Sequence, residues 1–356
     1  MTKKYKIFDF ADDTRLVQSS SEFIEGFVPP DYLINGLLQR RYLYSITAQT
    51  GSGKTAICLL LSAHIAQGLP LGNNETAKGR VLYLAGENPD DIRMRWTAMA
   101  QQLGIDPGKM EVYFVPGAQK LSQIASRIAQ EMEECDLSLV VIDTSAAYYE
   151  GDDENNNVQA GTHARRLREL VKLPGGPTVL VCCHPTKNAG DDNLLPRGGG
   201  AFIAEVDGNL TCKKNGNVVE LHCQGKFRGP DFSPLQFQLK TVTHERLKDS
   251  RGRLIPTVVA LHLSEESRQA MAASSRRDED LLLKAIAENQ SASPNILARL
   301  LGWFMKDGAP YRMKVNRAAN ALKKQKMICH RRDAWELTPA GRAELKRLAE
   351  PQPCEG

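Results

Sequence analysis

The sequence predicts an α/β fold in which helices cover a mostly parallel sheet, followed by a small helical domain at the C-terminus. Strand-like and helix-like segments alternate between residues 41 and 184. The apolar runs at 137–144 and 177–184 are typical of strands that are buried on both faces. After residue 279, short segments with helical periodicity follow the strand-like segments. Repeated strand–helix units of this kind predict a parallel sheet between two helical layers.

The elements follow from hydrophobic periodicity and from the breakers between the periodic segments. Helices are expected between the strands, and Gly68 and Pro70 mark the end of the first. Beyond residue 200, Asn215-Gly216 predicts a β-hairpin. The expected strands lie at 41–48, 80–86, 111–117, 137–144, 177–184, 237–242 and 257–264. The expected helices lie at 54–68, 89–103, 119–134 and 157–173.

Changes in composition divide the chain into four expected segments. These are an N-terminal arm at 1–30, an α/β domain at 31–265, a polar linker at 266–278 and a C-terminal domain at 279–350. The last segment contains three helical stretches, a short hairpin and a closing helix. That order resembles a winged helix-turn-helix, a fold that binds either nucleic acid or other proteins.

The composition excludes several classes of protein. Of the 356 residues, 42% are hydrophobic and 25% are charged, which argues against a disordered chain, a collagen and a coiled-coil rod. No apolar stretch approaches the roughly 18 residues that cross a membrane, and the N-terminus lacks the apolar segment of a secretory signal. The eight cysteines form no C-x-x-C pair. We therefore expect a cytoplasmic protein with no membrane partner.

Positive charge is concentrated near the C-terminus. The whole chain carries a net charge of +4, whereas residues 276–348 alone contain 16 Lys and Arg against 8 Asp and Glu. A basic block behind a nearly neutral body indicates a module that binds a polyanion such as duplex DNA. The alternative is an ordinary solvated helical surface, or a surface that binds a protein, and charge alone does not separate these.

The strongest motif lies between the first expected strand and the first expected helix. It matches a P-loop, with alanine where the first glycine usually stands. Glycines let successive N–H groups turn toward phosphate oxygens, the lysine reaches the β- and γ-phosphates, and the threonine hydroxyl binds Mg²⁺. We expect ATP and Mg²⁺ here, held by Ala48, Gln49, Thr50, Gly51, Ser52, Gly53, Lys54, Thr55 and Ala56.

Two carboxylates follow strands of the same expected sheet. Asp143 ends the apolar strand LSLVVID, where a P-loop sheet places a ligand to Mg²⁺ alongside Thr55. Glu87 follows the strand RVLYLAG, at the edge of the sheet where ligands bind. A carboxylate at that edge can orient and deprotonate an attacking water. The alternatives are an aspartate that only caps a strand and a surface glutamate.

Together the segments ITAQTGSGKT, LAGEN, VVIDT and VLVCCHPTK, followed by PRGGGAF, resemble the RecA-like core of ring ATPases. More narrowly they resemble hexameric replicative helicases of the plasmid RepA type, with DnaB-type helicases as more distant relatives. The resemblance covers about residues 25–265. It implies that Glu87 is the catalytic base and that His184, at the end of the fifth strand, senses the γ-phosphate.

The segment Gly225–Pro230 resembles the K-x-R-x-G-P motif of the same ring helicases. The resemblance implies that Arg228 reaches into the ATP site of the neighbouring subunit and that Lys226 assists it. An arginine supplied in this way neutralises charge on the transferred phosphoryl group and contributes ~10³–10⁵ in rate. The alternative is a basic strand end that faces solvent or DNA.

The resemblance also implies partners. It predicts a homo-oligomer, as a hexameric ring, with single-stranded DNA contacting the loops at 146–160 and 187–200. Tyr148 and Tyr149 either stack on bases or pack beneath the first loop. The predicted function is that of an ATP-driven DNA helicase or translocase in the replication of a plasmid, phage or integrated element. The alternatives are a recombination or repair ATPase and a DNA-binding regulator switched by ATP.

Overall fold

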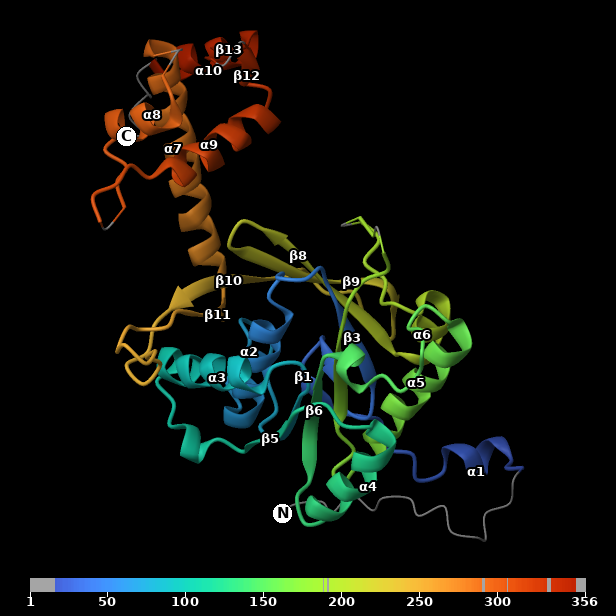
Figure 1. Ribbon diagram of the computed structural model, residues 1–356. Coiled ribbons are helices and arrows are strands. Elements are labelled where there is room, and N and C mark those ends of the chain that lie inside the picture. The colour runs from blue at the N-terminus through green and yellow to red at the C-terminus, as the bar shows by residue number, and fades with distance from the viewer. Residues whose placement is uncertain are drawn as a thin grey trace, which may run out of the picture. The chain divides into compact units, whose positions relative to one another are not determined.

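The structure is a computed structural model that describes residues 17–349 except 188, 191, 290, 291, 306, 332 and 333. The chain divides into two compact units, at residues 1–263 and 264–356 (Figure 1). Of the expected N-terminal arm, residues 1–16 lie outside the described residues, as does residue 350 of the expected C-terminal domain.

Within the described residues, a nine-stranded sheet forms the centre of the first unit. Six neighbouring strands run parallel, in the order β8-β3-β7-β6-β4-β5, and β9, β10 and β11 extend the sheet beyond β8 with antiparallel pairing. The parallel strands are β3 (Leu43–Thr47), β4 (Arg80–Ala85), β5 (Val112–Pro116), β6 (Leu137–Asp143), β7 (Thr178–Cys183) and β8 (Gly208–Asn215). The others are β9 (Val218–Phe227), β10 (Leu235–Val242) and β11 (Thr257–His262). The RecA-like α/β fold that the sequence predicts is confirmed.

Helices cover both faces of this sheet. The residues of β4 alternate between the two sides, so that Tyr83 joins one hydrophobic core and Leu84 joins the other. The first core includes α2 (Lys54–Gln67) and α3 (Pro89–Leu103). The second includes α4 (Leu121–Glu131), α5 (Asn157–Glu169) and α6 (Gly199–Glu205). Burial on both faces explains why β6 and β7 are apolar along most of their length.

The order of the strands decides where functional groups meet. Strand β7 lies between β3 and β6, and β4 lies on the far side of β6. Because these strands are parallel, their carboxyl ends share one edge of the sheet, where ligands bind in open α/β sheets. The P-loop, His184 and Glu87 follow the ends of β3, β7 and β4, and Asp143 is the last residue of β6.

Smaller elements complete the first unit. The hairpin of β1 (Tyr32–Ile34) and β2 (Leu38–Gln39) precedes β3, and the short helix α1 (Ser20–Ile24) lies in the described part of the expected arm. The hairpin of β8 and β9 forms as predicted, with Asn215 opposite Val218. Its turn residues are therefore 216 and 217, one position later than the Asn-Gly pair suggested.

The second unit is a helical cluster with a small hairpin. Its elements are α7 (Glu265–Glu288), α8 (Pro294–Leu300), α9 (Arg312–Lys324), β12 (Ile328–Arg331), β13 (Ala334–Leu337) and α10 (Pro339–Ala349). Leu283, Ile286, Leu297, Val315 and Leu322 form its buried core. None of the helices in the described ranges has the length and apolar content that crossing a membrane requires.

The residues expected to form a linker, 266–278, are the first half of α7. The side chain of Ser264 caps this helix by accepting a hydrogen bond from the backbone N–H of Ser267. Glu265 and Glu266 lie in the first turn, where the positive end of the helix stabilises acidic groups. The segment contains neither glycine nor proline, so its polar composition marks an exposed helix rather than an irregular connection.

Candidate active site

The P-loop connects the end of β3 to the start of α2, and its glycines adopt conformations that other residues avoid. Gly51 has φ 77° and Gly53 has φ 92°. A Cβ at Gly53 would also lie 2.8 Å from the side chain of Leu239 on β10. Both features explain why glycine stands at these positions. Helix α2 begins at Lys54, which directs its positive end at the loop.

Lys54 is buried beneath this loop. Only 6% of its surface is exposed. Its Nζ donates to the backbone oxygens of Ala48, at 2.7 Å, and of Gln49, at 3.3 Å. The ammonium group therefore lies inside the ring of backbone that a phosphate would occupy, and it carries the charge that phosphate binding requires.

Thr55 and Asp143 form the second part of the site. The Thr55 hydroxyl hydrogen-bonds the Asp143 carboxylate. Tyr83 also donates to this carboxylate, with 2.7 Å between Oη and Oδ2. Burial raises the pKa of Asp143 above its usual value, an effect that these two hydrogen bonds oppose. A cation beside the carboxylate would favour its ionised form.

The donor set fits Mg²⁺. One hydroxyl and one carboxylate meet at this point, and among the described residues no group of three or more His, Cys, Asp or Glu side chains is arranged to hold a metal. Mg²⁺ is commonly bound by one or two protein oxygens together with substrate phosphates and waters. Thr55 and Asp143 would hold it, and the ion would neutralise charge on the phosphates.

Glu87 and His184 lie together over the end of β6, although each follows a different strand. The Thr144 hydroxyl donates to Glu87 Oε1 at 2.7 Å. His184 Nε2 lies 3.7 Å from the same oxygen. Burial and the nearby charge of Lys54 lower the pKa of His184, which keeps its imidazole neutral at neutral pH. None of the motifs assigns a role to Thr144, although its position directly after Asp143 places it at the same edge of the sheet.

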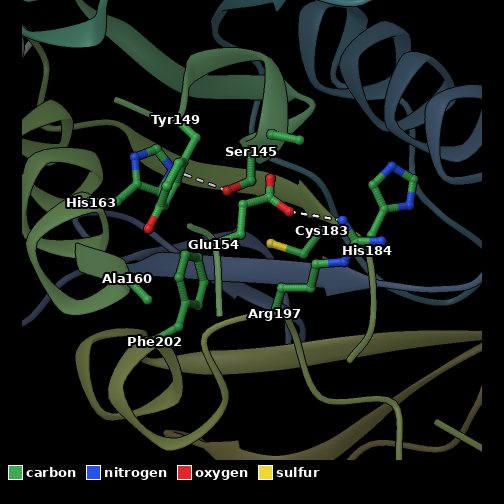
Figure 2. Close-up of a pocket in the computed structure, with 10 residues that line it drawn as sticks. Ser145, Tyr149, Glu154, Ala160, His163, Cys183, His184, Arg197 and Phe202 are labelled. Atoms are coloured by element: carbon green, nitrogen blue, oxygen red, sulfur yellow. Dashed lines mark hydrogen bonds and ion pairs between the residues drawn. The ribbon is translucent and has the colours of Figure 1, made fainter. Parts of the chain in front are cut away.

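His184 also lines a small pocket (Figure 2). His163 faces it from α5, and its Nε2 lies 3.0 Å from the hydroxyl oxygen of Ser145. Its Nδ1 is buried without a hydrogen-bond partner. Burial lowers the pKa of His163 to about 4, so the ring is neutral at neutral pH. Tyr149 packs edge-on against this ring, at 4.9 Å between centroids.

The two loops expected to contact DNA are joined to each other at this pocket. Arg197 Nη1 lies 2.8 Å from Glu154 Oε2, an ion pair between the 187–200 and 146–160 loops (Figure 2). Tyr148 is buried, and its hydroxyl donates to the backbone oxygen of Gly117. Both tyrosines thus pack against the protein, which was one of the two expectations for them. Residues 188 and 191 of the second loop lie outside the described residues.

Lys226 and Arg228 are not brought to this site. They lie at the end of β9, where Phe227 pairs with Gly208 at the start of β8. Arg228 Nε is 3.2 Å from Asp207 Oδ1, and Asp207 Oδ2 accepts from the backbone N–H of Leu43 at the start of β3. The P-loop follows the other end of β3. The two cations therefore occupy the opposite edge of the sheet from the P-loop of their own chain.

These cations are held there by the backbone and by Asp207. Lys226 Nζ donates to the backbone oxygen of Ala204 at 2.6 Å. Burial, with the neighbouring charge of Arg228 as the second cause, lowers the pKa of Lys226. The side chain of Arg228 remains 63% exposed. An exposed cation fixed at one edge of the sheet is available to a partner outside this chain.

One family model matches the chain, over residues 12–190, and is described as an AAA domain. The match covers half of the chain and includes the P-loop, Glu87, Asp143 and His184. It ends before Lys226 and Arg228.

Proposed function

We propose that this chain, which belongs to the AAA domain family and is a P-loop ATPase, works as a ring-forming DNA helicase or translocase. The proposal follows the resemblance to plasmid RepA-type hexameric replicative helicases. Its cellular role would be the replication of a plasmid, phage or integrated element in the cytoplasm.

The proposed chemistry is hydrolysis of ATP at the edge of the sheet described above. Lys54 would neutralise the β- and γ-phosphates, while Thr55 and Asp143 would hold Mg²⁺. Glu87 would orient and deprotonate the attacking water, and His184 would contact the γ-phosphate. The 3.7 Å between Glu87 and His184 supports this division, because both side chains face the same point.

The position of Arg228 is the observation that supports the proposed ring. Its anchor Asp207 lies beside Leu43, and the P-loop begins after Thr47, four residues further along β3. At 3.3 Å per residue these points are roughly 13 Å apart along the strand. Arg228 therefore lies near the opposite end of β3 from the P-loop of its own chain. A second copy whose P-loop edge met this edge would receive the guanidinium, and repetition of that head-to-tail contact forms a ring where the rotation between copies closes.

The proposed channel ligand is single-stranded DNA, at the loops 146–160 and 187–200. Both loops follow the carboxyl ends of strands beside the nucleotide edge. Lys187 is exposed. Arg197 is already paired with Glu154, so DNA would have to compete with that carboxylate.

For the second unit we propose a winged-helix-like domain that binds duplex DNA. On α9, Arg312, Arg317, Lys323 and Lys324 are exposed, whereas Val315, Ala318, Ala319 and Leu322 are buried. Lys314 is less available than the sequence suggests, because it pairs with Asp278 at 2.8 Å. A replication protein is the second candidate for this unit. Exposed apolar residues favour that candidate, namely Ile296, Leu300, Phe304, Met305 and Met313.

A strand-displacement assay on forked DNA with ATP tests the proposal, together with mass determination with and without nucleotide. We expect displaced strand and a mass of several subunits. Hydrolysis stimulated by DNA without displacement would favour the recombination or repair ATPase. A monomer whose duplex binding depends on ATP would favour the regulator.

A further inference from the structure

Thr144 is buried at the centre of the candidate active site. It follows Asp143 at the end of β6, and only 3% of its surface is exposed. Strand β6 lies between β4, which leads to Glu87, and β7, which leads to His184. The Thr144 side chain therefore stands between the two groups to which the proposed function assigns the attacking water and the γ-phosphate.

The contacts of Glu87 show how Thr144 affects the orientation of its carboxylate. Its side chain is 56% exposed, so packing alone does not fix its rotamer. The Thr144 hydroxyl donates to Oε1 at 2.7 Å, a distance typical of a strong bond to a carboxylate. His184 approaches the same oxygen only to 3.7 Å. Oε1 is thus directed at Thr144, and Oε2 is the oxygen left to accept a proton from water.

We propose that Thr144 is a positioning residue that holds the carboxylate of Glu87 over the metal and phosphate site. This inference rests on the proposed role of Glu87 in hydrolysis. A glutamate side chain has several rotamers, and a catalytic base works only within hydrogen-bonding reach of the proton it removes. A buried hydroxyl on a rigid strand end selects one rotamer before the substrate binds.

Thr144→Val tests this in the full-length protein, because valine keeps the shape and removes the hydroxyl. We expect kcat for ATP hydrolysis to fall about ten-fold, the effect of one hydrogen bond to a charged group. The KM for ATP should stay close to that of the wild type, since the P-loop contacts are unchanged. Thr144→Ser keeps the donor and should restore most of kcat.

The matched control is Thr178→Val. Thr178 is also a fully buried threonine with one short hydrogen bond, to the backbone oxygen of Gln39, but it begins β7 at the opposite edge of the sheet. It should lose stability in the same way as Thr144→Val while keeping kcat. If Thr144→Val does not fold, Thr144→Ala also lacks the hydroxyl and replaces it.

Several outcomes overturn the inference. A kcat in Thr144→Val equal to or above that of the wild type would do so. A Thr144→Ser protein as slow as Thr144→Val would also do so, as would a loss of kcat in Thr178→Val equal to that in Thr144→Val. Glu87→Gln, measured in parallel, tests separately the proposed role of Glu87 as the catalytic base, on which this inference rests. If Glu87→Gln hydrolyses ATP normally, the assigned role of Glu87 fails first. If Glu87→Gln is inactive and Thr144→Val is fully active, only the role of Thr144 fails.

Discussion

Lys54, Asp143 and Thr144 are polar side chains that the fold almost completely buries. Burial of such groups is costly unless each finds a partner. Here Lys54 contacts backbone oxygens of its own loop, Asp143 accepts from Tyr83, and Thr144 donates to Glu87. The candidate site is therefore already ordered by hydrogen bonds within the protein, and a nucleotide would exchange some of them for its own.

The first residue-scale prediction concerns Lys54. Lys54→Ala removes the buried cation from the phosphate loop, so hydrolysis should fall by about a hundred-fold or more. Binding of a fluorescent ATP analogue should weaken, while circular dichroism stays unchanged. The control is Lys240→Ala, because Lys240 is an exposed lysine that contacts Gln102 away from the loop. Normal hydrolysis in Lys54→Ala would refute the assignment of the phosphate site.

The second residue-scale prediction concerns His163 and pH. Its folded pKa is about 4, against an ordinary value of 6.5. Between those values the unfolded chain binds a proton that the folded chain does not, so stability rises with pH across this window and is lost as pH falls through it. The shift corresponds to about 3 kcal/mol of unfolding free energy.

Urea unfolding of wild type and His163→Gln at several pH values between 4 and 7 measures this contribution. We expect the free energy of unfolding to depend less on pH in the variant, because it lacks the titrating group. Equal pH dependence in the two proteins would show that the imidazole is solvated rather than buried.

At the scale of elements, α7 changes how the chain can be divided. The helix runs without interruption from Glu265 to Glu288, and its second half carries Leu282, Leu283 and Ile286 of the C-terminal core. A chain cut near residue 274, inside the segment expected to be a linker, would therefore end in the middle of a helix. The boundary between the compact units lies after Leu263.

A chain that ends at Leu263 should fold and hydrolyse ATP at the basal rate, because every residue assigned to the nucleotide site precedes that point. It should bind duplex DNA much more weakly, since it lacks the basic block at 276–348. Fluorescence anisotropy with labelled duplex at several salt concentrations measures this, and the affinity of the full chain should fall steeply with salt.

A full-length variant with Lys323, Lys324 and Lys326 changed to glutamate provides the control for truncation. It should lose duplex affinity to a similar extent without losing the domain. If the truncated chain binds duplex as well as the full chain at matched salt, the second unit is a docking element for protein.

At the scale of the whole molecule, the sheet carries complementary groups on opposite edges. The phosphate loop, Glu87 and Asp143 follow the carboxyl ends of parallel strands, while Arg228 is anchored by Asp207 beside the start of β3. One chain cannot bring these two edges together. The proposed head-to-tail contact would bring them together between neighbouring copies.

Mixing two inactive variants tests this contact. Arg228→Ala retains a complete P-loop, and Lys54→Ala retains the arginine. In mixed assemblies some interfaces pair an intact Lys54 site with an intact Arg228, so ATPase activity should partly return. Subunit exchange is verified by mass determination with one variant carrying a size tag. A mixture that exchanges subunits but stays inactive would argue against a role of Arg228 in a neighbouring site.

Much of the fold could be predicted from the sequence because its signals are local. Apolar runs with breakers between them located the strands and helices of the parallel sheet within a few residues. The glycines, lysine and threonine of the motif at 48–55, between a strand-like and a helix-like segment, defined the phosphate loop. The polar stretch at 266–278 was harder, because exposed helices and linkers are both polar. The absence of glycine and proline and the capping by Ser264 are what distinguish the helix.

What the sequence by itself determined is therefore the class of fold, the phosphate loop and the carboxylates that follow neighbouring strands. The tertiary structure alone decided which of these groups meet. Strand order places Thr144 between Glu87 and His184, and pairing of β9 with β8 carries Arg228 to the far edge of the sheet. Thr144 and Glu87 are 57 positions apart in the sequence, and Arg228 and Asp207 are 21 positions apart. Sequence patterns report only on neighbours within one strand or helix turn, so they do not predict these contacts.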